Sequence, residues 1–254
     1  MTDDKKEMIS KNQIKYVKQL EQKKHRQQEG VFVAEGPKVV GDLLDAGFEP
    51  RMLFATAEWA GSHKCQVPPT PLLSEELRKL SFLQHPQQVL AVFPIPTQSF
   101  SHDSRTSSLI LVLDGIQDPG NLGTIIRLAD WFDIDEIVCS QDTADAWSPK
   151  VVQATMGSIA RVKISYTDLQ EYLKHTSLPI CGTLLDGDDI YAQQLPQEAV
   201  IVMGNEGNGI SPQIRQLVGR RLLIPQFRQG PESLNVAIAT AIICSEFRRR
   251  ERFL

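Results

Sequence analysis

The chain has 254 residues, 41% of them hydrophobic and 23% charged, and this ordinary globular composition excludes a protein that is disordered as a whole. No stretch approaches the ~20 apolar residues that cross a bilayer, and the first ten residues contain no apolar core, so we expect a cytoplasmic protein without a membrane partner. The formal net charge of -4 does not by itself indicate a nucleic-acid binder, although Lys and Arg gather between residues 11 and 26 and between residues 248 and 252.

The four cysteines and five histidines are scattered along the chain. No CxxC pair occurs, and no group of these residues has the close spacing that zinc sites require. We therefore predict reduced thiols and assign no metal.

The first 94 residues have the pattern of a small α/β domain. Ile14, Val17 and Leu20 recur at helical spacing on a face away from the lysines, so the chain should open with a basic amphipathic helix. Ser74 is the expected N-cap of a later helix. The predicted strands are 30–36, 51–56 and 88–95, and the further predicted helices are 37–47 and 74–82. Residues 95–108, rich in serine and proline, are predicted to be a linker.

From residue 109 to residue 254 the pattern predicts a second domain. Six apolar runs alternate with helical segments, which is typical of a mostly parallel sheet with helices on both faces. The last helix, 233–250, is apolar on almost every side up to Ile243 and then becomes basic, so its first part should be buried. The predicted strands are 109–114, 136–140, 161–165, 179–185, 199–204 and 221–226.

Polar loops follow three of these strands, at the edge where ligands of parallel sheets collect. In the first loop, DPGNLGTIIRLADWF, Asp118 or Asn121 is the expected cap of a helix, and Arg127 lies in its second turn. Taken alone, Arg127 is an ordinary exposed helical arginine. The third loop, IPQFRQGPESLNVAIAT, leads into the last helix, where Ser233 or Asn235 is the expected cap.

The second loop, MGNEGNGIS, is rich in glycine. Its GxxGxG spacing is neither a dinucleotide-binding fingerprint nor a P-loop. No basic residue follows before Arg215, and Glu206 within the loop would repel a phosphate. The loop therefore predicts a neutral or cationic ligand.

Together the three loops resemble the three signature motifs of the SpoU (TrmH-type) family of RNA ribose 2'-O-methyltransferases, within the SPOUT superfamily. Each occurs once, in the family order, across about residues 109–246, and the domain at 1–94 is similar to an L30e-like RNA substrate-binding domain. The resemblance implies an α/β SPOUT fold whose carboxyl-terminal part forms a trefoil knot. It also implies a homodimer with the active site at the subunit interface.

The same resemblance implies S-adenosylmethionine as the methyl donor, bound in the knot mainly by backbone groups. Its cationic sulfonium agrees with a glycine loop that carries no phosphate-binding cation. By position in the family motifs, the residues that bind the donor are Thr183, Leu184, Gly204, Asn205, Gly207, Ile224, Gln226, Ser233, Leu234 and Asn235.

The catalytic residues that the resemblance implies are Arg127, Asn121, Glu206, Ser233 and Asn235. A ribose 2'-hydroxyl attacks the sulfonium methyl group, and this hydroxyl needs its proton drawn off. The family role of Arg127 is that of a base, but a guanidinium with a pKa above ~12 is better suited to bind the RNA phosphate and stabilise the developing charge. The proton acceptor stays open. For Glu206, a purely structural role, in which it bonds to backbone amides of the knot, is an equally good hypothesis.

A ribose 2'-hydroxyl target requires RNA and excludes DNA. The basic residues at 11–26 and 248–252 would then neutralise RNA phosphates. The amino-terminal domain favours ribosomal RNA as the substrate. Two alternatives stay open: a tRNA ribose 2'-O-methyltransferase, and a non-catalytic RNA-binding or ribosome-assembly factor on the same scaffold.

Overall fold

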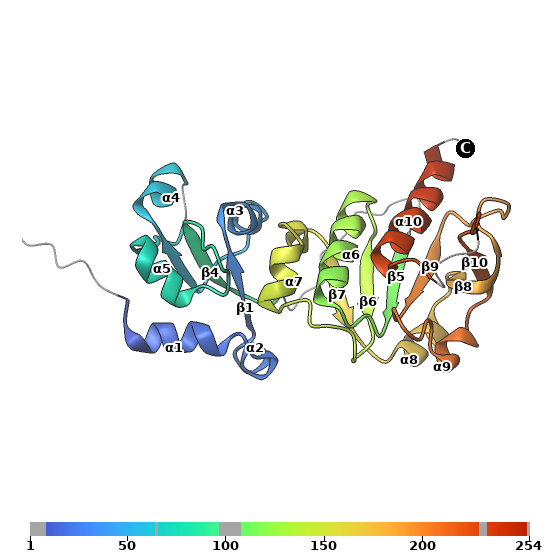
Figure 1. The fold of residues 1–254 in the computed structure, drawn as a ribbon, viewed down its shortest axis with the longest axis horizontal. Coiled ribbons are helices and arrows are strands. Elements are labelled where there is room, and N and C mark those ends of the chain that lie inside the picture. Colours follow the sequence, from blue (N-terminus) through green and yellow to red (C-terminus); the bar gives the residue numbers. More distant parts are fainter. Residues whose placement is uncertain (1–8, 64–65, 97–107, 229–232, 253–254) are drawn as a thin grey trace, which may run out of the picture. The chain divides into compact units, whose positions relative to one another are not determined.

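The computed structural model describes residues 9–63, 66–96, 108–228 and 233–252, and the chain divides into two compact units (Figure 1). The first unit contains residues 1–98 together with 147–160, and the second contains residues 99–146 and 161–254. Most of the predicted linker, 95–108, lies outside the described residues.

The first unit is built on a mixed four-stranded sheet in the order β1-β4-β2-β3. β4 pairs antiparallel with β1 and β2, and β2 pairs parallel with β3. The predicted strands and helices of this unit are confirmed, and β3, α2 and α4 are additional. The elements are β1 (Val31–Glu35), β2 (Met52–Ala55), β3 (Thr70–Pro71) and β4 (Val89–Pro94), with α1 (Lys11–Gln19), α2 (Lys23–Glu29), α3 (Pro37–Asp45), α4 (Ala57–Ser62) and α5 (Ser74–Leu80).

Local hydrogen bonds explain where two of these helices begin. Ser10 and Gln13 form a capping box at α1, in which the Gln13 N–H donates to Ser10 Oγ at 3.2 Å and the Ser10 N–H donates to Gln13 Oε1 at 3.0 Å. At α5 the prediction of Ser74 as N-cap is wrong. Leu73 holds that position, because its N–H donates to the Glu76 carboxylate at 3.0 Å and Ser74 is the first helical residue.

The amphipathic pattern at the start of the chain is confirmed. Val17 and Leu20 are buried in a hydrophobic core with residues of β1 and β4, and Ile14 packs against that core. Burial of an aliphatic side chain contributes about 1.5–3 kcal/mol. This stripe therefore fastens α1 to the sheet of the first unit.

Residues 147–160 come from far along the chain and pack in the first unit. They contain α7 (Pro149–Ala154), which contacts β1, and a 3-10 turn at Ser158–Ala160. The Trp147 ring lies 4.9 Å from the Phe32 ring of β1. Gly157, with φ +97°, lies so close to Asp42 that a Cβ there would meet the carboxylate at 2.1 Å. The region predicted as one domain from residue 109 thus contains a segment that completes the other unit.

The second unit contains a six-stranded sheet in the order β10-β8-β9-β5-β6-β7. All neighbouring strands are parallel, so their carboxyl ends meet at one edge. The six predicted strands are confirmed, and the largest difference is that β8 continues well past residue 185. The strands are β5 (Leu109–Asp114), β6 (Glu136–Cys139), β7 (Lys163–Tyr166), β8 (Ile180–Asp189), β9 (Ala199–Gly204) and β10 (Arg220–Leu223).

Two pairs of helices pack on this sheet. Residues of α8 (Leu169–His175) and α9 (Pro212–Arg215) share a core with Val112, Val138 and Val202 of the strands. α6 (Pro119–Trp131) and α10 (Val236–Arg252) contact each other, and α10 also contacts β9 (Figure 1). The chain thus returns from the edge strand β10 to the middle of the sheet before α10 begins. The trefoil knot stays a prediction.

The described cysteines are not candidate nucleophiles. Cys139, Cys181 and Cys244 are free and buried, and burial raises the pKa of their thiols to about 12, 11 and 12, respectively. Such thiols stay protonated and unreactive at neutral pH. Cys65 lies outside the described residues.

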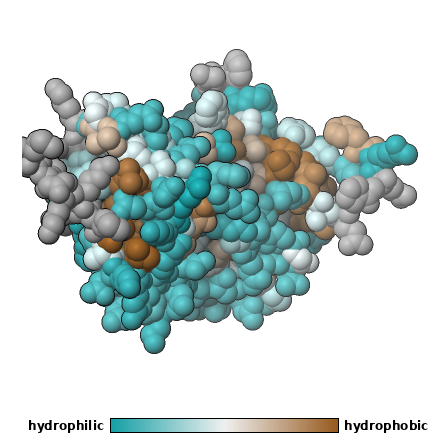
Figure 2. Space-filling view, turned by 60° about the vertical axis from the view of Figure 1, so that its left-hand side comes forward, coloured by the Kyte–Doolittle hydropathy of each residue, from teal (hydrophilic) through white to brown (hydrophobic). Residues whose placement is uncertain are grey.

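The face of the molecule in Figure 2 is mostly hydrophilic, with apolar residues gathered in a few brown areas. No helix among the described residues combines the length and the apolar character that a membrane span needs. The large apolar side chains that the structure leaves exposed are Leu73, Trp131, Met156, Leu185, Tyr191, Phe227, Leu234 and Ile238.

Candidate active site

One asparagine side chain joins the three predicted motif loops. Asn121, in the first loop, donates from Nδ2 to Glu206 Oε1 in the second loop at 2.9 Å. Its Oδ1 accepts from Asn235 Nδ2, in the third loop, also at 2.9 Å. The three loops therefore meet at one place, although Asn121 is 85 positions from Glu206 and 114 from Asn235 in the sequence. We call Asn121, Glu206 and Asn235 the amide network.

Two long helices begin at the amide network. Asp118 caps α6, because its Oδ1 accepts from the Asn121 N–H at 2.7 Å. Asn235 caps α10, because its Oδ1 accepts from the N–H groups of Ala237 at 2.9 Å and Ile238 at 3.3 Å. The first turns of both helices carry partial positive charge. This charge stabilises the Glu206 carboxylate, which accepts from Asn121 where both helices begin.

Gly204 allows the loop after β9 to fold back tightly on itself. Asn205 and Gly209 exchange two backbone hydrogen bonds, at 3.0 and 2.9 Å. A Cβ on Gly204 would lie 2.2 Å from backbone atoms of both Gly209 and Ile210. No side chain fits at this position, which explains the glycine in physical terms.

Asn205 holds this loop in shape. Its Oδ1 accepts from the N–H groups of Gly207 at 2.9 Å and Asn208 at 3.1 Å, and its Nδ2 donates to the Gly115 carbonyl at 2.6 Å. The hypothesis that Glu206 braces the loop through backbone amides is therefore wrong for the described part of the chain. Its hydrogen bond goes to Asn121, a side chain of another loop.

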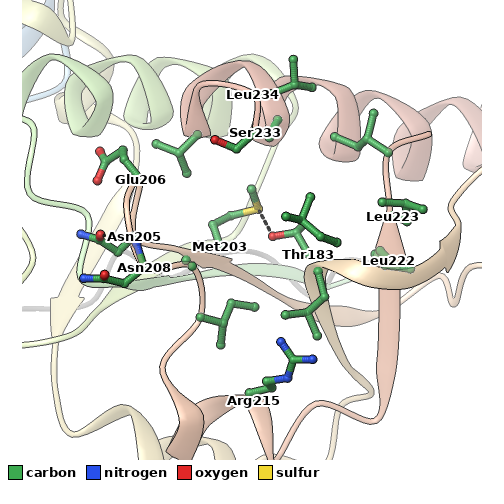
Figure 3. A pocket seen from close by; sticks show the side chains of 18 of the residues that line it. Thr183, Met203, Asn205, Glu206, Asn208, Arg215, Leu222, Leu223, Ser233 and Leu234 are labelled. Carbon is green, nitrogen blue, oxygen red and sulfur yellow. Dashed lines mark hydrogen bonds between the residues drawn. The ribbon is translucent and has the colours of Figure 1, made fainter. Parts of the chain in front are cut away.

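A cavity of about 500 Å³ lies between the glycine loop, the ends of β8 and β10, and the start of α10 (Figure 3). Thr183 on its wall donates from Oγ1 to the Val202 carbonyl at 3.2 Å and lies 3.7 Å from the Met203 sulfur. Gln226 and Asn235 do not line the cavity. The other predicted donor-binding residues do, and they are Thr183, Leu184, Gly204, Asn205, Gly207, Ile224, Ser233 and Leu234. Glu206, from the predicted catalytic set, also lines it.

Several lining residues were not predicted. An apolar residue that faces a cavity has the same sequence pattern as one that faces the core, so the strand residues among them gave no signal. Two charged residues among them could have been found from the sequence. Arg215 is the first basic residue after the glycine loop, and Asp186 directly follows an apolar run. The additional lining residues are Leu185, Asp186, Met203, Asn208, Gly209, Ile210, Arg215, Leu222, Leu223, Val236 and Ala239.

Arg127 stands apart from the amide network and does not line the cavity. It is exposed and makes no hydrogen bond or ion pair with any other residue that the structure describes. Six positions after Asn121 on α6, it points about 120° away from that side chain. It shares a face instead with Trp131, which is 82% exposed. The structure thus brings Asn121, Glu206 and Asn235 together and leaves Arg127 on an exposed face.

The part of the chain that forms this sheet and cavity matches a known protein family. Residues 108–245 match the SpoU rRNA Methylase family. The chain belongs to this family. Residues 11–91 match the MRM3-like substrate binding domain, so the first unit also has counterparts.

Three SpoU-type relatives cover nearly the whole chain. The 23S rRNA (guanosine(2553)-2'-O)-methyltransferase of Bacillus subtilis is 32% identical over 247 residues, which are 94% of this chain and 97% of the relative. A solved structure from Porphyromonas gingivalis, assigned to the TrmH family, is 42% identical, covers 96% of this chain and 99% of its own, and has a TM-score of 0.84. An AdoMet-bound rRNA methyltransferase from Sinorhizobium meliloti is 30% identical, with 94% and 95% covered and a TM-score of 0.82.

In this SpoU protein the basic residues near the amino terminus are only partly free for a ligand. Arg26 is 2% exposed, and its guanidinium donates to the carbonyls of Leu20 at 2.7 Å and Glu21 at 2.6 Å. Lys18 donates to the Ser81 carbonyl at 2.5 Å. Arg26 thus closes the end of α1 and does not form part of a phosphate-binding surface. The exposed lysines of this region are Lys11, Lys15, Lys23 and Lys24.

The arginines near the carboxyl terminus also have partners within the protein. Arg248 donates to the Phe132 carbonyl at 2.7 Å, and Arg249 and Arg250 both pair with Glu246 at 2.7 Å. The predicted phosphate-binding patch at 248–252 is therefore corrected for Arg248 and Arg250. These residues anchor the end of α10 within the second unit.

Proposed function

We propose that this chain is an S-adenosylmethionine-dependent methyltransferase that acts on a ribose 2'-hydroxyl of ribosomal RNA. The observation that carries the proposal is the amide network, which joins three family motifs beside one cavity. A 23S rRNA ribose methyltransferase and an AdoMet-bound rRNA methyltransferase, both at 30% identity or more, support the donor and the substrate class. The match to an MRM3-like substrate binding domain adds support for an RNA substrate.

The cavity suits this donor in size and chemistry. Its volume of about 500 Å³ lies within the usual range for small-molecule sites. Leu222, Ile224 and Leu234 offer apolar walls to an adenine ring, and the glycine loop offers backbone groups that can approach closely. When bound, the donor supplies a methyl group on a positively charged sulfur. The Glu206 carboxylate favours that charge, whereas it would disfavour a nucleotide phosphate.

The amide network would hold the ribose. Both groups of the Asn121 amide already have a partner, which fixes its orientation: the NH2 faces Glu206 and the oxygen faces Asn235. The second N–H of Nδ2 and the second lone pair of Oδ1 stay available to ribose hydroxyls. Ser233 lies on the cavity wall beside Leu234, so its hydroxyl would be available to the bound donor or the nucleotide.

We further propose a homodimer formed through α6 and α10. Trp131 of α6 is 82% exposed and Ile238 of α10 is 54% exposed, on two helices that contact each other. Exposed apolar surface of this kind marks interaction sites. Since Arg127 lies on the same face of α6 as Trp131, association through this face would carry Arg127 to the cavity of the partner. There its guanidinium would bind the RNA phosphate and stabilise charge that develops on the attacking oxygen.

Mutation of Arg127 tests the catalytic assignment. We expect Arg127→Ala to lower kcat by about 10²–10³, the usual effect of removing one charge-stabilising donor. Donor affinity, measured by calorimetry, should stay unchanged because Arg127 does not line the cavity. Unchanged turnover would refute the role of Arg127, and wild-type protein that fails to bind S-adenosylmethionine would refute the donor.

Mixed dimers test whether Arg127 serves the partner. Arg127→Ala protomers combined with Asn121→Ala protomers should regain activity, because one of the two sites then has an intact Asn121 and receives an intact Arg127. Trp131→Glu should yield monomers in sedimentation and lose turnover. Mixed dimers without activity would contradict a shared site.

The RNA class is tested by mapping ribose methylation in total RNA with and without the gene. We expect one 2'-O-methyl group to disappear from ribosomal RNA. Loss from a tRNA would overturn the assignment of the substrate. No loss, together with no donor binding, would favour a non-catalytic RNA-binding factor.

A further inference from the structure

The cavity has three charged side chains in its wall, and only one of them belongs to the amide network. Glu206 bonds to Asn121. The other two, Asp186 and Arg215, form an ion pair with each other. Figure 3 places Arg215 on a different wall from Glu206, across the cavity from Ser233 and Leu234. An otherwise apolar and amide-lined cavity therefore has a second polar region of both charges.

The position of Asp186 is fixed by the backbone around it. Gly187 follows it in β8, where a Cβ would lie 2.9 Å from backbone carbons of both Arg221 and Leu222 in β10. The pairing of β8 and β10 shifts register between Arg221 and Leu222. This close approach brings Arg221 Nη1 to 2.9 Å from Asp186 Oδ2. Arg221 does not line the cavity, so it restrains Asp186 from outside.

The ion pair is not needed to hold the fold together. The side chains of Asp186 and Arg215 are 48% and 41% exposed, and ion pairs this exposed contribute little to stability. Both charges therefore remain available to a ligand that offers an opposite charge to each. With Arg221 included the cluster has one carboxylate and two guanidinium groups, which leaves room for one further negative charge.

We propose that Asp186 and Arg215 form the subsite for the α-amino acid end of the methyl donor. This inference rests on the proposed function, in which S-adenosylmethionine occupies the cavity. The Arg215 guanidinium donates to the ligand α-carboxylate with its planar fork, and the Asp186 carboxylate accepts from the ligand α-ammonium. The zwitterion thus exchanges partners with the ion pair, so neither charge is left unpaired in the complex. The apolar walls are left for the adenine ring.

Two ligands that differ only in the amino acid end test the subsite. S-adenosylhomocysteine has the α-amino acid and no sulfonium charge, whereas 5'-methylthioadenosine has the same adenine, ribose and thioether without the amino acid. We would measure both affinities by calorimetry on the full chain. In Arg215→Gln, binding of S-adenosylhomocysteine should weaken about tenfold, the effect of removing one charge-assisted hydrogen bond, while 5'-methylthioadenosine changes less than about twofold.

Arg220→Gln is the matched control, because Arg220 is the neighbouring arginine of β10, does not line the cavity and donates to the Gln194 carbonyl instead of Asp186. Its ratio of the two affinities should stay within about twofold of wild type. Asp186→Asn removes the charge that faces the ammonium, so it should also weaken binding of S-adenosylhomocysteine relative to 5'-methylthioadenosine. This variant replaces Arg215→Gln in the test if Arg215→Gln does not fold. An unchanged ratio in Arg215→Gln, or equal losses for both ligands, would overturn the subsite and leave the proposed function intact. Wild-type protein that binds neither S-adenosylmethionine nor S-adenosylhomocysteine would overturn the proposed function itself.

Discussion

Replacing Gly204 by alanine should disrupt the donor cavity. The added Cβ would lie 2.2 Å from the Gly209 carbonyl carbon and the Ile210 nitrogen, whereas ordinary contact begins at 3.4 Å. Backbone atoms cannot swing aside as a side chain does, so the loop would have to move by about 1 Å. That movement separates Asn205 from Gly209, which are joined by hydrogen bonds of 3.0 and 2.9 Å. Overpacking costs typically 1–3 kcal/mol and each broken hydrogen bond about 1 kcal/mol.

The expected loss of about 3–5 kcal/mol corresponds to a drop in melting temperature of roughly 6–20 °C for a chain of this size. Calorimetric titration should show donor affinity at least tenfold weaker than in wild type. Gly219→Ala is the control, because Gly219 does not line the cavity and a Cβ there meets only the Ile180 carbonyl oxygen at 3.8 Å, an ordinary contact. Wild-type melting and donor binding in Gly204→Ala would refute the reasoning.

Burial raises the pKa of the Glu35 carboxyl, so its ionised form reduces stability near neutral pH, and this cost disappears as the pH falls through the folded-state pKa. Glu35→Gln should therefore gain unfolding free energy relative to wild type as the pH rises above the ordinary glutamate pKa of about 4.5, and urea unfolding that gives a constant difference would contradict this. Replacing Lys11, Lys15 and Lys24 together by alanine should weaken rRNA binding and reduce its salt slope by about 0.7–0.9 for each RNA phosphate that the protein no longer neutralises; an unchanged slope in filter binding would exclude these lysines from the interface. Arg248→Ala should instead lower the melting temperature and leave the salt slope as in wild type, because Arg248 is used to anchor α10.

The parallel sheet was predictable because its central strands β5, β6 and β9 are mostly buried and form almost continuous apolar runs. All six runs after residue 108 are strands in the structure. The segment 147–160 shows the limit of such patterns. Its local sequence allows a helix, and Ser148 caps α7 as expected for such a residue. Which surface covers that helix depends on β1, more than 100 positions earlier, and no local pattern contains this information.

The candidate site was predictable as a set of residues and not as an arrangement. The family resemblance supplied Asn121, Glu206 and Asn235, but their hydrogen bonds join positions 85 and 114 residues apart. Arg127 belongs to the same motif as Asn121, yet six helical positions turn the two side chains apart by about 120°. A motif thus groups residues by their place in the sequence, while the helix geometry decides which of their side chains meet.

Neighbouring residues of the glycine loop illustrate the same separation of roles. Asn205 turns its side chain back on its own loop and bonds to the N–H groups of Gly207 and Asn208, so it shapes the backbone. Glu206, the next residue, points to another loop and bonds to Asn121 beside the cavity. Both are polar residues in a loop at the end of a buried strand, and sequence alone could assign the bracing role to either. Only the direction of each side chain separates them. The residue that shapes the loop is the amide, which both donates and accepts, whereas the carboxylate, which only accepts, bonds to Asn121 and lines the cavity.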